Sequence, residues 1–175
     1  DDPAVADAFS LQTAVKSRFP DVGIIRSIPI ARHADAARQT ILRLAARLEP
    51  VSDFFLTDTV IDGPPETVDG DQPVAGFVGI TGLTCDWSVA AELVDRSRIP
   101  VILAGGISPE NAAEGIRRVN PAGVDSCTCT NALDGNARPI RFRKDMTRVS
   151  ALVGQVRLMD ERMPIGDDRR PHAAQ

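Results

Sequence analysis

Features that would mark several other classes of protein are scarce in this chain of 175 residues. Its three cysteines are few and odd in number, which does not suit a disulfide framework, so we expect a reducing, cytoplasmic environment. The longest apolar stretches, such as residues 22–30, are too short to cross a bilayer, and Arg26 interrupts that one. We therefore expect no membrane partner.

Basic residues are also not in excess. The sequence contains 20 lysines and arginines and 24 aspartates and glutamates, which gives a net charge of −4. This balance argues against nucleic acid as the main partner, while a local basic patch could still bind an anion. With 43% hydrophobic and 25% charged residues, the composition is that of an ordinary globular domain.

The stretch 100–126 is the most informative part of the chain. Residues 101–103 form a continuous apolar run, as expected for a parallel strand that is covered on both faces. Gly105 and Gly106 then allow a sharp turn, and Ser-Pro-Glu at 108–110 reads as the capped start of a helix. Accessible amides beside a helix N-terminus suit a phosphate group.

Strands and helices are expected to alternate along the whole chain. This order predicts a parallel sheet with right-handed crossovers, and four such units are about half of an eight-unit barrel. An open doubly wound sheet is the alternative. The expected strands are 22–30, 53–59, 100–103 and 123–129; the expected helices are 4–19, 34–48, 87–96, 111–119 and 145–158.

The remaining segments are expected to be irregular. Residues 61–73 form a loop long enough to suggest a function, and the turn-rich segment before residue 145 is basic. We expect one domain over 1–158 and a flexible tail over 159–175. The chain begins with Asp1, and its first strand follows a helix, so we expect it to be the end of a longer protein.

Five motifs, taken in order, resemble the phosphoribosylanthranilate isomerase family. The similarity extends from about residue 22 to 153 and rests on FFLTDT (54–59), GITGLTCDW (79–87), PVILAGGISPEN (100–111), PAGVD (121–125) and Lys144-Asp145. The resemblance implies an α/β fold: the C-terminal half of a (β/α)8 TIM barrel, strands five to eight, with the N-terminal units missing. The chemistry would lie at the C-terminal ends of the strands.

The resemblance also implies a reaction. It is an Amadori rearrangement in tryptophan biosynthesis, in which N-(5-phosphoribosyl)anthranilate opens and becomes an amino-ketose. Asp58 matches the family's general acid, whereas the family's base is a cysteine at the end of strand one, which this chain lacks. We therefore expect the chain alone to be inactive. No cofactor and no metal are implied.

The resemblance further implies that the loops after the strands hold the phosphorylated sugar. Two loops depart from the family pattern: Gly79-Ile80 replaces a glycine pair, and residues 127–131 replace a motif of two serines, a glycine, a hydrophobic residue and a glutamate. The expected substrate-binding and phosphate-binding residues are Gly82, Gly105, Gly106, Cys127, Thr128 and Cys129.

Several residues have a second interpretation. Asp58 could cap a loop, and Gly105 and Gly106 could serve a tight turn only. The cationic side chains of Arg141, Arg143 and Lys144 could neutralise a phosphate or be solvated. Asp125 is expected in the barrel interior. Cys85, Cys127 and Cys129 could bind a thiophilic metal if they lie together, although small pocket-lining residues are the simpler interpretation.

Two hypotheses about function remain. The chain is either the C-terminal part of an isomerase or a non-catalytic half-barrel that binds a phosphorylated sugar or assembles with a partner. A half-barrel would leave apolar residues such as Val101, Leu103 and Val124 uncovered and its sheet edges open. We therefore expect it to pair with its missing N-terminal half or to form a homodimer.

Overall fold

A four-stranded parallel sheet organises the protein. The structure is a computed structural model that describes residues 3–60 and 82–162. The sheet consists of β1 (Ile25–Ala31), β2 (Phe54–Val60), β3 (Val101–Leu103) and β4 (Gly123–Val124), in the order β1-β2-β3-β4. Because every strand pairs with the next one along the chain, this order is that of an arc of a barrel. A doubly wound sheet would reverse its strand order at a switch point.

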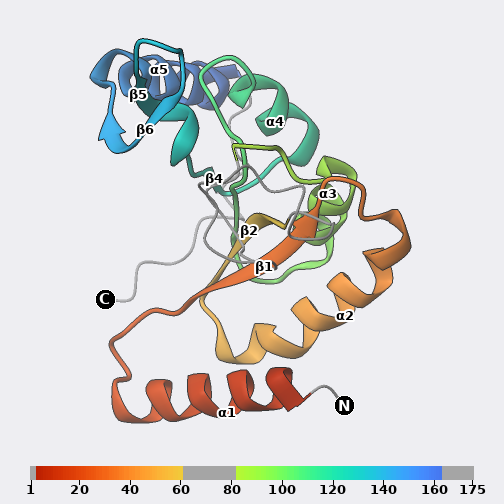
Figure 1. Ribbon diagram of the computed structural model, residues 1–175. Coiled ribbons are helices and arrows are strands. Elements are labelled where there is room, and N and C mark those ends of the chain that lie inside the picture. The colour runs from red at the N-terminus through yellow and green to blue at the C-terminus, as the bar shows by residue number, and fades with distance from the viewer. Residues whose placement is uncertain (1–2, 61–81, 163–175) are drawn as a thin grey trace.

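Helices connect and flank the strands (Figure 1). α2 lies between β1 and β2, α3 precedes β3, and α4 joins β3 to β4, as parallel crossovers require. α1 precedes the first strand and α5 follows the last. The helices are α1 (Pro3–Arg18), α2 (Arg38–Leu48), α3 (Trp87–Arg96), α4 (Ala112–Val119) and α5 (Met146–Arg162). In the described part of the chain they are accompanied by the 3-10 turns η1 (Asp35–Ala37), η2 (Glu49–Val51) and η4 (Thr128–Thr130).

The start of α3 shows how local sequence determines an element. Asp86 has an extended backbone, and its Oδ1 accepts hydrogen bonds from the amides of Ser88 and Val89 at 3.0 and 3.4 Å. A carboxylate in this position satisfies amides that have no partner within the helix. Both the cap and the bounds 87–96 agree with the sequence prediction.

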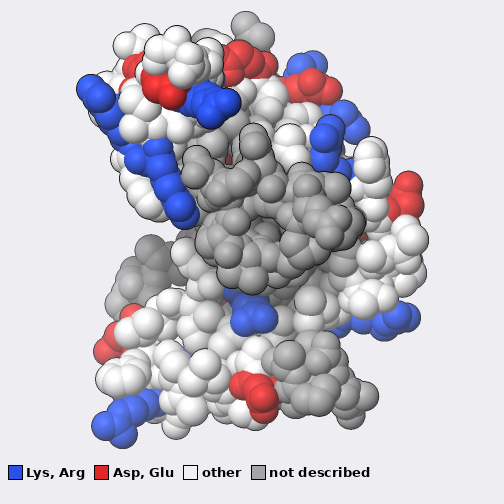
Figure 2. All heavy atoms as spheres, viewed as in Figure 1, with Lys and Arg blue, Asp and Glu red and all other residues white. Residues whose placement is uncertain are grey.

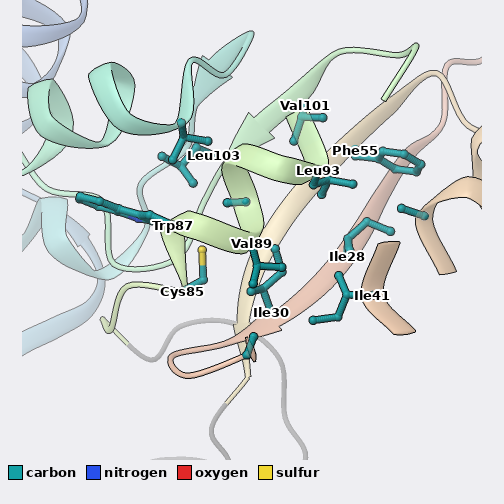
Figure 3. Packing of buried hydrophobic residues seen from close by; sticks show 14 of the residues in the cluster. Ile28, Ile30, Ile41, Phe55, Cys85, Trp87, Val89, Leu93, Val101 and Leu103 are labelled. Atoms are coloured by element: carbon teal, nitrogen blue, oxygen red, sulfur yellow. The ribbon is translucent and has the colours of Figure 1, made fainter. Parts of the chain in front are cut away.

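The hydrophobic core lies between one face of the sheet and the helices. Its completely buried members include Ile28 and Ile30 of β1, Phe55 of β2 and Leu103 of β3. Side chains from α2 and α3 pack against this face, as Figure 3 shows for Ile41, Val89 and Leu93.

This core corrects one expectation. Val101 and Leu103, which we expected to be uncovered, have exposed fractions of 2% and 0%. Both belong to the cluster that the helices cover, and Val124 is partly buried against it. Ile102, between them in the strand, is less buried because successive side chains of a strand point to opposite faces.

The C-terminal third departs most from the sequence prediction. The fourth strand ends at Val124 instead of continuing to Cys129, and the turn η4 replaces its last residues. The segment expected to be turn-rich and basic contains an antiparallel hairpin of β5 (Asn131–Leu133) and β6 (Pro139–Lys144). In β6, Ile140 and Phe142 alternate with arginines, a period of two that is typical of a strand and that the sequence prediction did not use.

Two further expectations concern the ends of segments. α5 extends through Arg162, so residues 159–162 of the predicted tail are helical. The predicted loop 61–73 and the rest of the tail lie outside the described residues. No helix in the described part of the chain is both long and apolar enough to cross a membrane.

Candidate functional site

Asp58 lies near the C-terminal end of β2 and faces away from the helix-covered core. Burial alternates along this strand: Phe55, Thr57 and Thr59 are buried, whereas Asp58 is only partly buried. Because neighbours in a strand point to opposite faces, Asp58 belongs to the face that would line a barrel. The C-terminal ends of parallel strands are where α/β proteins place their ligand sites.

Several groups influence the carboxyl group of Asp58. Burial is the largest cause and raises its pKa above the usual value, and the negative charge of Asp125 adds to this effect. The amide of Thr59 opposes both, because it donates a 2.8 Å hydrogen bond to Asp58 Oδ1 and so stabilises the ionised form. The net shift is upward, as general acid catalysis near neutral pH requires.

Two threonines on the opposite face of β2 hold the neighbouring loops in place. Thr57 Oγ1 accepts a hydrogen bond from the amide of Ala104 and donates one to its carbonyl, at 2.9 and 3.0 Å. Thr59 Oγ1 donates a 2.8 Å hydrogen bond to the carbonyl of Leu83. The loop after β3 and the segment before α3 are thereby both attached to the strand that carries Asp58.

Gly105 and Gly106 follow β3 and pack tightly against these same segments. Both have positive φ angles, +90° and +58°, which favour glycine. A Cβ atom on Gly105 would overlap Thr59 Oγ1, and one on Gly106 would lie 2.6 Å from the amide nitrogen of Thr84. The turn and its packing therefore require glycine at both positions.

Side-chain hydrogen bonds hold the turn that leads from these glycines into α4. Ser108 Oγ accepts a 3.2 Å hydrogen bond from the amide of Glu110, while Asn111 Oδ1 accepts one of 2.9 Å from the amide of Ser108. The helix itself begins at Ala112, and Asn111 before it makes no side-chain capping bond, so the predicted cap at Ser108 belongs to the preceding turn. Asn111 also donates to the carbonyl of Gly106 through Nδ2, so the glycine turn and the helix start are one connected unit.

Residues after β4 meet the end of the loop after β2. A Cβ atom on Gly82 would lie 3.6 Å from Cγ2 of Thr128, and Cys129 Sγ lies 3.8 Å from the carbonyl oxygen of Gly82. Thr128 Oγ1 is buried and has no hydrogen-bond partner among the residues that the structure describes. A buried hydroxyl without a partner is uncommon in folded proteins, and a polar ligand atom could satisfy it.

The structure therefore brings together two groups of predicted residues around the end of β2. Gly105 and Gly106 contact it through Thr59 and the 83–84 backbone, and Gly82 contacts Thr128 and Cys129. The adjoining loop residues Gly79 and Ile80 lie outside the described part of the chain.

Two cationic side chains hold the turn 127–130. Lys144 Nζ donates to the carbonyl of Cys127 and, at 2.9 Å, to Thr130 Oγ1. Arg148 Nε donates to the carbonyl of Cys129 at 2.8 Å, and its Nη2 contacts Glu110 Oε2 at 3.0 Å. Sequence reasoning missed Arg148, because its partners are 19 and 38 residues away and no local pattern indicates them.

The other basic residues of the hairpin have different surroundings. Arg141 and Arg143 are exposed, and the guanidinium of Arg141 lies 5.0 Å from the centre of the Phe142 ring. Figure 2 shows basic side chains gathered at the side of the molecule where Figure 1 places the hairpin. Of the three hairpin cations considered from the sequence, Lys144 is the one that contacts the turn.

The cysteines do not form the cluster that a metal site would need. Cys127 and Cys129 lie at a turn rather than on a strand, which removes the reason to expect that they point the same way. Cys85 is buried in the core beside Thr57 and Ala104 (Figure 3). Among the described residues, no three His, Cys, Asp or Glu side chains could hold a metal ion.

The thiols of Cys85 and Cys129 are also poor candidates for a thiolate base. Burial raises the pKa of Cys85 to about 11, and burial is likewise the main cause that raises the pKa of Cys129. Both thiols are therefore protonated at neutral pH, and a protonated thiol is neither a good base nor a nucleophile.

Comparison with known proteins agrees with the fold and with the sequence motifs. The family model of N-(5'-phosphoribosyl)anthranilate (PRA) isomerase matches residues 12–129. The chain is 27% identical over 150 residues to N-(5'-phosphoribosyl)anthranilate isomerase 1 of Methanosarcina mazei, covering 85% of this chain and 57% of the relative. It is 36% identical over 118 residues to the isomerase of Haloferax volcanii, covering 67% of this chain and 43% of the relative.

Solved structures give the same picture of the fold. Phosphoribosyl anthranilate isomerase from Thermococcus kodakaraensis superposes with a TM-score of 0.54 at 25% identity, over 83% of this chain and 56% of that one. An isomerase in complex with reduced 1-(o-carboxyphenylamino)-1-deoxyribulose 5-phosphate gives 0.53 at 19% identity, over 85% and 54%. The chain spans about half the length of the relatives it matches.

The fold is thus of the parallel α/β class, with the barrel-like strand order of TIM-barrel enzymes. Within that class, the chain belongs to the N-(5'-phosphoribosyl)anthranilate isomerase family.

Proposed function

We propose that this chain contributes strands five to eight of an N-(5'-phosphoribosyl)anthranilate isomerase of tryptophan biosynthesis, with Asp58 as the general acid. The observation that carries this proposal is the position of Asp58 at the C-terminal end of β2, on the face without helices, with a raised pKa. The isomerase names of its relatives support the choice of reaction.

In this reaction Asp58 would transfer its proton to the ring oxygen of the ribose. The bond between C1 and the ring oxygen breaks, and the lone pair of the anthranilate nitrogen forms a double bond to C1. A base then removes the proton from C2, and the electrons move to give the enol form of the amino-ketose. A partly buried carboxylic acid suits the first step, because it is still protonated at a pH at which a solvated aspartate is not.

The base would come from outside this chain. The resemblance assigns it to a cysteine at the end of strand one, and the pKa shifts of Cys85 and Cys129 give neither of them the thiolate character that the role needs. We therefore propose that the chain is inactive by itself.

The phosphate of the substrate would lie between the two loop groups of the site. Backbone amides after β3, at Gly105 and Gly106, precede the N-terminus of α4, where amides and the helix dipole favour an anion. The buried Thr128 hydroxyl, next to Gly82, could donate a hydrogen bond to a phosphate oxygen. Cys127 and Cys129 would contribute the backbone of the same turn.

Four more strands would be needed to close a barrel around this site. The residues that alternate with the core, such as Leu56 and Ile102, would then line its interior. The chain matches 57% of the length of its Methanosarcina mazei relative, which fits a chain that supplies part of a barrel. We propose that the remaining units come from the rest of a longer polypeptide or from a second copy of this chain. We propose also that the complete protein is located in the cytoplasm. The Thermotoga maritima isomerase is described as dimeric.

The alternative is a half-barrel that binds a phosphorylated sugar without turning it over. The observation in its favour is the turn 127–130, where the family's serine and glycine motif is replaced and where Lys144 and Arg148 occupy backbone carbonyls. Such a protein would bind a ribose phosphate, and this binding would not depend on Asp58.

The decisive experiment is carried out on the natural gene product. The intact mass of this gene product is measured first and compared with that of the 175-residue chain. Conversion of N-(5'-phosphoribosyl)anthranilate is then assayed for the gene product, its Asp58→Asn variant and its Asp95→Asn variant. We expect turnover that Asp58→Asn abolishes and that Asp95→Asn, on the exposed side of α3, leaves intact. Binding of a ribose phosphate without turnover would support the alternative, and turnover that survives Asp58→Asn would overturn the assignment of the acid.

A further inference from the structure

Arg148 lies in the first turn of α5, which packs beside α4 (Figure 1), and its side chain contacts two loops that follow different strands. Its Nε donates a 2.8 Å hydrogen bond to the carbonyl of Cys129, in the turn after β4. Its Nη2 donates one of 3.0 Å to Glu110 Oε2, in the segment between β3 and α4. One guanidinium therefore joins the loop after β3 to the loop after β4.

This link reaches the glycine turn after β3 through a short series of hydrogen bonds. The amide of Glu110 donates to Ser108 Oγ, and the amide of Ser108 donates to Asn111 Oδ1. Asn111 Nδ2 in turn donates to the carbonyl of Gly106 at 2.9 Å. The position of the turn 127–130 is thus coupled to that of Gly106.

A second side chain joins the same two loops closer to the sheet. Ser126 Oγ donates a hydrogen bond to the carbonyl of Ile107. Lys144 also holds the turn 127–130, but its printed contacts in the described part of the chain lie within that turn and do not extend to the loop after β3. Without Arg148, the turn would be attached to the loop after β3 near Ser126 and could move about this point.

The positive charge of Arg148 is already paired. Glu110 Oε2 lies 3.0 Å from its Nη2, and the side chain of Arg148 is 31% exposed. A carboxylate beside a guanidinium offsets its charge, so Arg148 is not a free cation that would bind a phosphate directly. The planar guanidinium, with several donors in fixed directions, is suited to connecting two acceptors. These contacts fit a residue that shapes the site without contacting the substrate.

We propose that Arg148 is a positioning residue, which keeps the loops after β3 and β4 at the separation that the phosphate of the substrate requires. This inference rests on the proposed function, because these are the two loops that would hold the phosphate between them. The family model matches residues 12–129, so Arg148 lies outside it. A misplacement of about 1 Å between a substrate and the groups that bind it is costly, so the separation matters although Arg148 does not touch the substrate.

The first test is the steady-state kinetics of the natural gene product with N-(5'-phosphoribosyl)anthranilate. Arg148→Met removes both hydrogen bonds and keeps an unbranched stem. We expect KM to rise roughly tenfold with little change in kcat, because the phosphate is held equally in the bound substrate and in the transition state. A merely structural role would lower the folded fraction, and thus kcat, at an unchanged KM. Arg157→Met makes the same substitution at an exposed position of α5 and should change neither constant.

Glu110→Ala separates the link between the loops from the effect of charge. On charge alone, removal of a carboxylate should improve the binding of an anion and lower KM. We expect KM to rise instead, because the variant breaks the link to Arg148. The double variant should have a KM no higher than that of Arg148→Met alone, since both changes remove the same link. A lowered KM in Glu110→Ala, or effects that add in full, would overturn the inference.

Folding of the variants does not limit this test. The side chain of Glu110 is 63% exposed, so Glu110→Ala is expected to fold even if Arg148→Met does not. Its KM then decides between the two interpretations by the sign of the change.

Binding of ribose 5-phosphate, measured by calorimetry, separates this inference from the proposed function. We expect Kd to rise roughly tenfold in Arg148→Met and to stay unchanged in Arg157→Met. A gene product that shows this dependence but no turnover supports the role of Arg148 and contradicts the isomerase. Turnover with an unchanged KM in Arg148→Met shows the reverse. A gene product that neither binds ribose 5-phosphate nor turns over the substrate contradicts both.

Discussion

The two faces of β2 have opposite environments. On one face, Phe55, Thr57 and Thr59 are completely buried and either pack in the core or bind neighbouring loops. On the other, Asp58 is partly buried and carries a raised pKa. Packing is thus concentrated on one face, and the carboxyl group that we propose as the general acid lies on the other. A single seven-residue strand can serve both, because its side chains alternate.

The core face should show the largest effect of a single substitution. Phe55 has an exposed fraction of 0%, so Phe55→Ala is expected to lower the free energy of unfolding by about 3–5 kcal/mol through lost burial and the cavity it leaves. Leu56→Ala, on the opposite face of the same strand, is the matched control and should cost clearly less. Denaturant unfolding measures both, and equal losses would contradict the distinction between the faces.

The loop glycines after β3 should come next. Gly106→Ala is expected to cost about 2–3 kcal/mol, since its φ of +58° and the backbone of residues 83–84 both oppose a Cβ atom. Gly135→Ala has open space around it and should change the free energy of unfolding by less than about 1 kcal/mol. Thermal unfolding of the two variants is the measurement, and a harmless Gly106→Ala would mean that this packing is wrong.

Lowering the pH should reveal a smaller contribution to the free energy of unfolding, which comes from Glu49. Burial opposes its ionisation, but hydrogen bonds from the amide and guanidinium of Arg98 outweigh this, and its pKa lies below the usual value of 4.5. Its ionised form therefore stabilises the fold above pH 4.5, and this contribution is lost as pH falls through the lower value of the folded state.

A variant isolates this effect. The parent protein should be more stable than Glu49→Gln at pH 7, and the difference should shrink as the pH is lowered below 4.5. Urea titrations at a series of pH values test it. A difference that is constant with pH would show that Glu49 acts through packing alone.

The smallest expected effect has the opposite sign and belongs to Asp58. Because its pKa in the folded protein is raised, ionisation opposes folding, and stability is lost as pH rises from 3.8 through the higher folded value. Asp58→Asn removes this penalty and should raise Tm slightly at neutral pH, with no difference below pH 3.8. A lower Tm at neutral pH would indicate that Asp58 stabilises the fold and is not held there for function.

The sequence by itself determined the features that depend on neighbours a few residues apart. These are the alternation of strands and helices, the cap at Asp86 and the glycine turn that leads into α4. Each follows from local hydrogen bonding or from the period of the apolar residues. The motif order also identified the family, which the comparison with known proteins confirms.

Only the tertiary structure decided which face of each strand the helices cover and which loop residues meet. Val101 and Leu103 looked like barrel-lining residues because a continuous apolar run does not distinguish the faces of a strand. The turn at 128–130 is held by Lys144 and Arg148, more than ten residues away, and the contact of Gly82 with Thr128 spans 46 positions. Such long-range contacts depend on how distant segments of the chain pack together. The spacing of residues along the sequence therefore does not predict them.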